Sequence, residues 1–329
     1  MLAHDVQRFA MRKHRKPHKT ARLPAYIVEP DTIGTPKDEL IVALAQLRVE
    51  CAYPAPLESL SRRTVMRISG DLKKHYQRPN DPPCRLYSLS LSAISETLNG
   101  KRQRLTAFDW VASYVLSCLR HAVGQRLGRR DQGTTVLPDW RKIYALHAAE
   151  AVGDAVAVAE ARRAYQLPQS QRDFLLAHGP YGEILLARAE LGHPHARFRV
   201  AVLLACDPGQ GGEAVALLLD VASTGHPLAL DLLDACRDLP KGAGSGPDAD
   251  GSLSQVAAQC AWGLARTARG HGADTHARAF FRGAARGGKR EAVFELAKMV
   301  VTESDPELAR WLAQLETEEG TGRHHASER

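Results

Sequence analysis

The chain has 329 residues, of which 44% are apolar and 25% are charged, and its formal net charge is +7. This length predicts two or three domains, and the composition is that of an ordinary globular protein able to bury sizeable cores. No apolar run reaches the roughly 18 residues that a membrane span needs, so no membrane association is expected.

Helix is the expected secondary structure throughout the chain. Aromatic residues make up only 6% of the sequence. Ala and Leu dominate its second half, and almost no segment shows the apolar alternation of a half-buried strand. We therefore expect an all-α protein.

Charge is distributed unevenly along the chain. Residues 1–142 contain 25 Lys or Arg against 13 Asp or Glu, whereas residues 143–329 contain 19 against 24. A basic first half joined to an acidic second half suggests that only the first half meets a polyanion. Charge can also drift between domains without functional meaning.

The six cysteines are far apart and form no Cys-x-x-Cys pair. Several lie among Leu and Ala in helical patterns, where a thiol behaves as a small apolar residue. This usage indicates a reducing cytoplasm and argues against a disulfide scaffold or a cysteine-ligated zinc site. The basic residues near the N-terminus have no apolar segment behind them, so a signal peptide is not expected.

Residues 1–37 carry the basic cluster MRKHRKPHKTAR, followed by a stretch punctuated by Pro and Gly. An arm of this kind is usually mobile when free. It either follows DNA phosphates or serves as a solubilising tail.

Residues 38–130 are expected to form a helical domain. Apolar residues at helical spacing predict a helix from Asp38 to Cys51, and Pro56 suits the start of a shorter second helix. Gly70 and three prolines then break the pattern. They predict an extended, surface-exposed insertion over 69–88.

The stretch LSLSAISETLNGKR, residues 89–102, predicts a short helix with one polar face. Ser90 can cap the helix, Leu91, Ile94 and Leu98 share its apolar face, and the following Asn-Gly can end it. Small polar residues on the other face, with cations just beyond, suit a DNA major groove, because the backbone can then approach base edges. An ordinary amphipathic helix with a solvated face has the same pattern.

This stretch resembles the recognition-helix half of lambda-repressor/Cro-type helix-turn-helix regulators. The variants of high-GC bacteria are the most similar, since their next helix carries a Trp-Val-Ala-Ser-Tyr run like residues 110–114. The matching positions are Ser90, Ala93, Ile94, Ser95, Leu98, Asn99, Gly100 and Lys101. One departure is that some 20 residues between Ile68 and Ser88 replace the tight turn that the family has before this helix.

The resemblance implies that the helix over 90–99 reads DNA bases and that the protein forms a homodimer, because a single half-site gives weak affinity. The positions implied to face the bases or the backbone are Ser90, Ser92, Ala93, Ser95, Glu96, Asn99, Lys101, Arg102 and Arg104.

Beyond this domain a linker is expected over 131–142 and helical repeats over 143–316, with a flexible linker at 239–253 and a disordered tail at 317–329. Three segments share the pattern Ala-x-x-Gly followed by Ala four residues later. The residues are Ala189, Gly192 and Ala196; Ala222, Gly225 and Ala229; and Ala285, Gly288 and Ala292. Such a glycine ends one helix, and small residues let the next pack closely, so the units stack into a solenoid. The pattern resembles tetratricopeptide and Sel-like repeats.

No catalytic motif is present, so neither an enzyme nor a cofactor is expected. Five histidines gather near the expected turns between helices, but no Cys or carboxylate lies at ligand spacing from them, so no metal site is predicted. They are His193, His195, His226, His271 and His276.

Together these features predict a cytoplasmic, nucleoid-associated bacterial transcription regulator. An N-terminal helix-turn-helix bundle would bind double-stranded DNA, and a C-terminal α-hairpin solenoid would bind a protein, a peptide or another copy of the chain. The rival interpretation is a protein-interaction adaptor that keeps a degenerate helix-turn-helix as a packing unit. A steep salt dependence of DNA binding distinguishes the two.

Overall fold

The computed structural model describes residues 32–52, 60–75, 85–125, 133–207, 209–238, 249–303, 306 and 308–313. Within these ranges every regular element is a helix, so the all-α prediction is confirmed. Most of the expected arm (1–37), the expected tail (317–329) and residues 239–248 of the expected linker at 239–253 lie outside the described residues. None of the described helices combines the length and hydropathy that crossing a bilayer requires.

Four helices of the first half pack around one apolar core. They are α1 (Pro36–Ala52), α2 (Arg62–His75), α3 (Leu91–Leu98) and α4 (Phe108–Gln125). α4 is the central helix, because every residue from Val111 to Leu119 is buried. α1 contributes Leu40, Leu44, Leu47 and Cys51, which recur at helical spacing as the sequence predicts.

The insertion expected over 69–88 begins later than predicted. α2 continues to His75, and both Ser69 and Leu72 are buried. Val65, Ser69 and Leu72 lie at i, i+4 and i+7, so the helical stripe runs through Gly70, which the sequence analysis took for a helix breaker. Residues 76–84 lie outside the described part, and the Leu89 amide, just after it, donates to Ser69 Oγ (2.9 Å).

The linker expected over 131–142 is also wrong from residue 133 onwards. A 3-10 turn (Gly133–Val136) leads directly into α5 (Leu137–Val152), and Val136 and Trp140 are buried in the same core as α4. Pro138 lies in the first turn of α5, where its missing N–H costs nothing.

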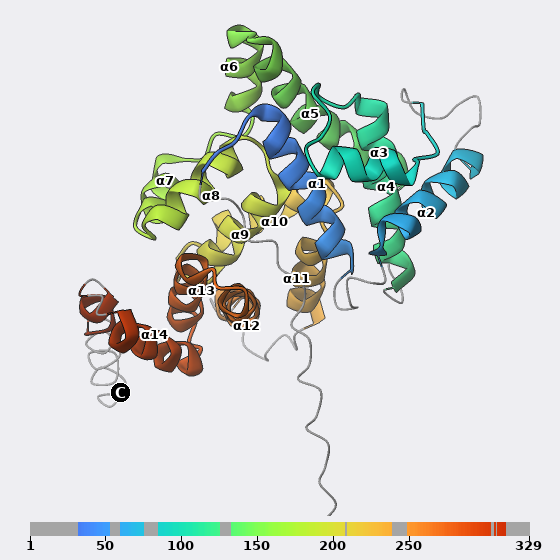
Figure 1. The fold of residues 1–329 in the computed structure, drawn as a ribbon. Coiled ribbons are helices and arrows are strands. Elements are labelled where there is room, and N and C mark those ends of the chain that lie inside the picture. Colours follow the sequence, from blue (N-terminus) through green and yellow to red (C-terminus); the bar gives the residue numbers. More distant parts are fainter. Residues whose placement is uncertain are drawn as a thin grey trace, which may run out of the picture.

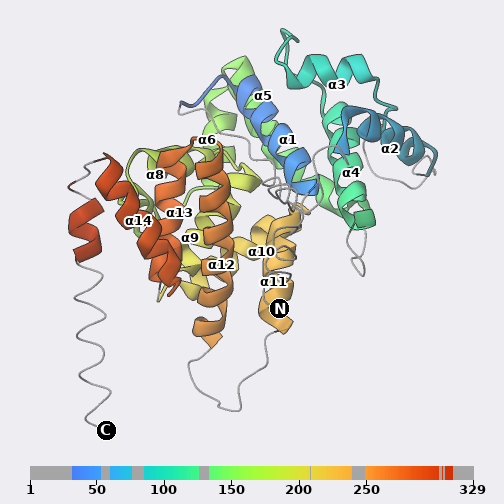
Figure 2. The same ribbon diagram turned by 60° about the horizontal axis from the view of Figure 1, so that its bottom comes forward.

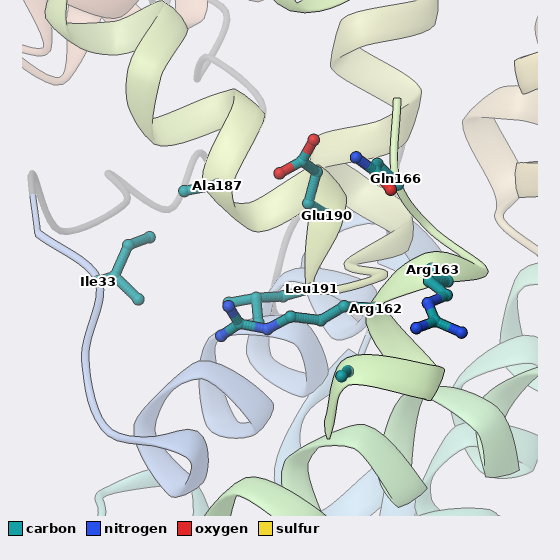
Figure 3. A pocket seen from close by; sticks show the side chains of 8 residues that line it. Ile33, Arg162, Arg163, Gln166, Ala187, Glu190 and Leu191 are labelled. Carbon is teal, nitrogen blue, oxygen red and sulfur yellow. The ribbon is translucent and has the colours of Figure 1, made fainter. Parts of the chain in front are cut away.

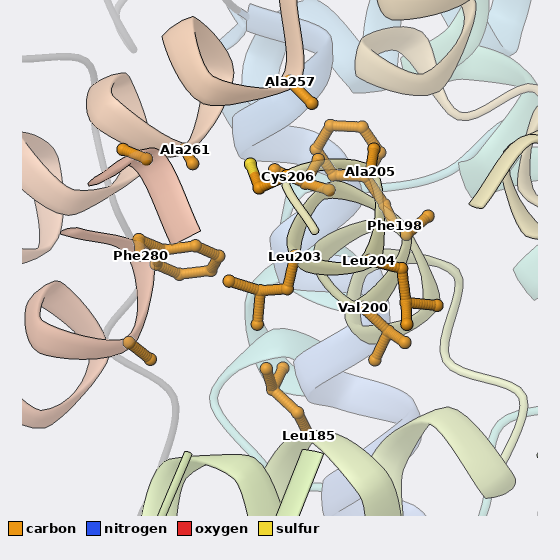
Figure 4. Close-up of a cluster of buried hydrophobic side chains, with 14 of the residues drawn as sticks. Leu185, Phe198, Val200, Leu203, Leu204, Ala205, Cys206, Ala257, Ala261 and Phe280 are labelled. Carbon is orange, nitrogen blue, oxygen red and sulfur yellow. The ribbon is translucent and has the colours of Figure 1, made fainter. Parts of the chain in front are cut away.

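The second half consists of consecutive helices, most of them joined by short turns. They are α6 (Ala155–Arg163), α7 (Gln169–Leu176), α8 (Pro180–Glu190), α9 (Pro194–Ala205), α10 (Gly211–Ser223), α11 (Pro227–Asp238), α12 (Ala249–Gly270), α13 (Asp274–Arg286) and α14 (Arg290–Glu303). Residues 249–253 of the expected linker therefore form the start of α12, and the residues between α11 and α12 lie outside the described part. Every residue of α9 is buried, and Figure 4 shows its Leu203 between Leu185 of α8 and Phe280 of α13.

The three repeat glycines occupy the turns that their pattern predicts. Gly192, Gly225 and Gly288 have φ values of 75°, 80° and 86° and connect α8 to α9, α10 to α11 and α13 to α14. The alanines that flank them are all buried: Ala189, Ala196, Ala222, Ala229, Ala285 and Ala292. Small residues therefore lie where the paired helices approach each other.

α1 lies between the two halves of the molecule. Figures 1 and 2 show it with α2–α4 on one side and the repeat helices on the other, and it contacts α4, α5 and α9. One stripe of α1 joins the apolar core of the first half. A second stripe, made of Glu39, Ala43, Gln46 and Glu50 at i, i+4, i+7 and i+11, is buried as well.

Two helical glycines make a matched test of the packing between α7 and α8. A Cβ on Gly182 would lie 1.8 Å from the Leu175 carbonyl oxygen, whereas a Cβ on Gly263 in α12 meets nothing within 4 Å. We expect Gly182→Ala to destabilise the protein by about 1–3 kcal/mol, because α8 must shift away from α7. Gly263→Ala should stabilise it by about 0.5–1 kcal/mol through helix propensity. Urea unfolding of both variants measures the difference, and equal stabilities would contradict the close contact.

Candidate nucleic-acid interface

α3 is a short helix with well-defined ends. Ser90 is its N-cap, and its Oγ accepts a hydrogen bond from the Ala93 amide (3.1 Å). At the other end Gly100 has φ +67°, and the Lys101 amide donates to the Glu96 carbonyl (2.9 Å). The serine cap and the left-handed glycine fix the helix over the residues that the sequence predicts.

The buried face of α3 differs in part from the predicted one. Ile94 and Thr97 are buried and Leu98 is half-buried, but Leu91 is 37% exposed. The helix is only eight residues long and packs against α2 and α1, and Leu91 at its start lies at the edge of this contact.

The exposed face of α3 carries most of the residues implied to contact DNA. Ser90, Ser92, Glu96 and Asn99 are exposed, as are Lys101 and Arg104 in the turn that follows; Ala93, Ser95 and Arg102 are half-buried. The structure therefore brings all nine residues together on α3 and its C-terminal turn.

Several of these side chains already have partners within the protein. Arg62, at the start of α2, donates to Ser95 Oγ (2.5 Å) and to Asn99 Oδ1 (3.0 Å). Arg102 lies 3.8 Å from Glu96 in an exposed ion pair. Ser95 and Asn99 thus fix α3 against α2, which leaves Ser92 and Glu96 as the polar groups that point outward from the middle of the helix.

α2, which packs against α3, carries further exposed cations, and sequence reasoning missed them. Arg63, Arg67 and Lys74 are exposed and share one face of α2 at i, i+4 and i+11. Lys37, at the start of α1, donates to the Gly100 carbonyl (3.4 Å). The pair Arg62-Arg63 followed by Arg67 at helical spacing was the available sequence signal for a basic helix beside α3.

A second cluster of charged and polar groups is buried where α1 meets the repeat turns. Arg188 of α8 donates to both oxygens of Glu39 (2.9 and 3.3 Å), and His193 Nε2 lies 3.7 Å from the same carboxylate. Further along α1, Glu50 contacts His195 and lies 2.6 Å from His226 Nε2. Sequence reasoning singled out these histidines but not the glutamates.

His193 and His195 of this cluster are held neutral by their surroundings. Burial lowers the pKa of His193 well below its ordinary value, and the charges of His147 and Arg188 add to the effect. Burial also lowers the pKa of His195, with a further contribution from Arg199. Neutral His193 therefore forms no ion pair with Glu39, whose charge is balanced by Arg188.

α5 adds to the connection between the two halves. Its Trp140 Nε1–H donates to the Thr224 carbonyl (3.0 Å) in the turn before α11, and Asp139 accepts from the Ser223 hydroxyl (2.8 Å). Of these two contacts between the halves, the Trp140 bond is buried and the Asp139 bond is exposed.

A pocket of about 380 Å³ lies between the segment before α1, α6 and α8. Figure 3 shows Arg162 and Arg163 of α6 near Glu190 and Leu191, with Ile33 on the opposite side. Arg162 pairs with Glu150 (2.6 Å), and Glu190 lies 3.6 Å from Arg172. Its lining charges are thus largely paired within the protein and indicate no particular ligand.

In comparisons with known proteins, no family model, no curated protein and no solved structure matches this chain. The fold and the geometry of its surfaces are therefore the observations on which a function can be based.

Proposed function

We propose that this chain is a sequence-specific, double-stranded DNA-binding transcription regulator of the cytoplasm, which places α3 in the major groove. The observation that carries the proposal is the exposed polar face of α3, which is followed by exposed cations in its C-terminal turn and is contacted by Arg62 of α2. Short polar side chains allow a helix backbone to approach base edges, and the cations beside it can contact phosphates.

The side chains of the surface divide into three roles. Ser92 and Glu96 read base edges, and Glu96 exchanges its ion pair with Arg102 for a cytosine amino group. The cations in the turn that follows α3 contact phosphates: Lys101, Arg102 and Arg104. Ser90, Ser95 and Asn99 hold the helix in place through the bonds described above, and Ala93 leaves room for close approach.

Cations of α2 contribute to the same binding mode. Arg63 and Arg67 are exposed on α2, the helix that packs against α3, and contact phosphates on the neighbouring part of the duplex. Phosphate contacts supply most of the non-specific affinity and make binding fall steeply with salt.

In this proposal the repeat helices form a platform for a protein, a peptide or a second copy of the chain. Exposed apolar side chains on several repeat helices support this role. Leu219 of α10 is 57% exposed and Phe294 of α14 is 68% exposed. Large apolar groups at the surface of a repeat array are suited to partner binding.

Replacing Ser92 tests the base-reading role of α3. Ser92→Ala should weaken the base preference at one position of the site by about 1 kcal/mol, because one base-edge hydrogen bond is lost. The salt dependence of binding should stay the same, since no phosphate contact changes. Binding to a panel of single-base variants of the site measures both quantities.

Ser170→Ala is the matched control, since Ser170 is an exposed serine of α7 in the repeat half. It should leave both the preference and the salt slope unchanged. An unchanged base preference in Ser92→Ala would contradict the placement of α3 in the groove.

A further inference from the structure

Three residues from distant parts of the sequence meet at the junction between α1 and the repeats. Glu50 lies in the last turn of α1, His195 in the first turn of α9 and His226 in the turn before α11. Each offers one ligand atom, and these atoms all lie within 4.8 Å of one another. All three residues are buried.

We propose that Glu50, His195 and His226 bind a divalent transition-metal ion of the zinc class. Two imidazole nitrogens and one carboxylate oxygen are a ligand set that Zn²⁺ prefers, whereas Ca²⁺ and Mg²⁺ prefer oxygen ligands alone. The contacts of Glu50 run to Nδ1 of His195 and Nε2 of His226, so these are the nitrogens that face the ion. The Ala229 amide donates to His226 Nδ1 (3.3 Å), and binding of the ion through Nε2 would place the ring proton on Nδ1 and replace this bond. Three protein ligands leave one position of a tetrahedral site for water.

The repeat architecture supports the need for a cation beside Glu50. Glu39 and Glu50 are 11 residues apart on one face of α1, and each meets the histidine that follows a turn glycine, His193 or His226. In the first turn, Arg188 precedes the glycine by four residues and balances Glu39. The residue four positions before Gly225 is Val221, whose side chain is buried. The turn at Gly225 therefore has an apolar side chain at the position where the turn at Gly192 has the guanidinium of Arg188.

The burial of the three side chains agrees with a bound cation. Glu50, His195 and His226 are 4%, 5% and 1% exposed. Arg199, on the same helix as His195, is buried as well and donates to the Tyr181 hydroxyl (2.6 Å). A metal ion between the two imidazoles would balance the buried Glu50 carboxylate.

An ion at this position would also connect the two halves of the protein. Glu50 belongs to the helix that supplies Leu40, Leu44 and Leu47 to the core of the first half. His195 and His226 belong to two successive repeat turns. The ion would therefore hold the C-terminal end of α1 against the turns before α9 and α11. The Arg188–Glu39 pair holds the N-terminal end of the same helix.

Metal titration of the full-length, chelator-treated protein tests the proposal. Co²⁺ should bind at one equivalent with visible absorption bands, and Zn²⁺ should displace it. Glu50→Gln and His226→Gln should each weaken Co²⁺ affinity at least about 10-fold, because each removes a ligand. His271→Gln is the control, since His271 is an exposed histidine after α12, and it should bind as the wild type does.

X-ray absorption of the Zn²⁺-loaded wild type keeps the test decisive if a variant fails to fold. We expect a shell of N and O atoms at about 2.0–2.1 Å with imidazole scattering. Binding below one equivalent in the wild type, unchanged affinity in both folded ligand variants, or sulfur in the first shell would overturn the proposal.

Discussion

Replacing Arg188 with methionine should lower the free energy of unfolding by about 3–5 kcal/mol, because it removes the cation that pairs with the buried Glu39 carboxylate and leaves the Gly34 amide as the hydrogen-bond donor to that group. The side chains of Arg188 and Glu39 are only 1% and 2% exposed, and the guanidinium contacts both carboxylate oxygens. It also donates to the Thr32 carbonyl (3.3 Å), so the segment before α1 loses a bond as well. Guanidinium chloride unfolding of the full chain measures the loss.

Two further variants distinguish the effect of an unpaired buried charge on stability from the effect of removing a side chain. The double variant Glu39→Gln/Arg188→Met removes both charges and should be more stable than Arg188→Met alone. Arg237→Met is the surface control, since Arg237 is 81% exposed beside Asp234, and it should change stability little. If Arg188→Met behaved like Arg237→Met, the buried junction between α1 and the repeats would be disproved.

Replacing Lys101, Arg102 and Arg104 together with alanine should reduce DNA affinity by roughly two orders of magnitude near physiological salt. Each phosphate contact contributes about 0.9 to the slope of log affinity against log salt, so the slope should fall by about 2–3. Stability should change little, because Lys101 and Arg104 are exposed and Arg102 is half-buried. Fluorescence anisotropy over a range of salt concentrations measures both the affinity and the slope.

A triple variant of the repeat half provides the matched control for net charge. Arg163, Arg237 and Lys298 are exposed cations far along the chain from α3. Their replacement with alanine lowers the net charge by the same amount but should leave the salt slope unchanged. An equal loss of affinity in the two triple variants would show that DNA binding follows total charge rather than the surface at α3.

Features set by neighbouring residues were predictable from the sequence. The ends of α3 depend on the Ser90 cap and on Gly100, both of which act within one helical turn. The repeat turns depend on Gly192, Gly225 and Gly288, whose left-handed conformation is also a local property. The leucine stripe of α1 follows directly from helical periodicity.

Features set by distant residues could not be predicted in this way. Glu39 and Glu50 look like solvent-exposed residues of an amphipathic helix, and only Arg188, His195 and His226, far along the chain, explain their burial. Local signals also misled at two places. Gly70 lies inside α2, and the helix continues past it to the buried Leu72. Pro138 lies in the first turn of α5, whose Trp140 donates a hydrogen bond to the Thr224 carbonyl.

The resemblance of residues 89–102 to a recognition helix therefore rests on local features, whereas the cations of α2 and the bonds from Arg62 depend on how α2 packs beside α3. The two helices that carry these residues pack against each other. The DNA-binding proposal requires them to act together.

Selection of bound sequences from a random duplex pool by the full-length protein, near physiological salt, tests this central proposal most directly. We predict enrichment of a defined sequence motif, together with affinity that falls steeply as salt rises. Absence of enrichment combined with salt-insensitive binding would contradict it, and would leave α2 and α3 as packing elements of a protein-interaction adaptor.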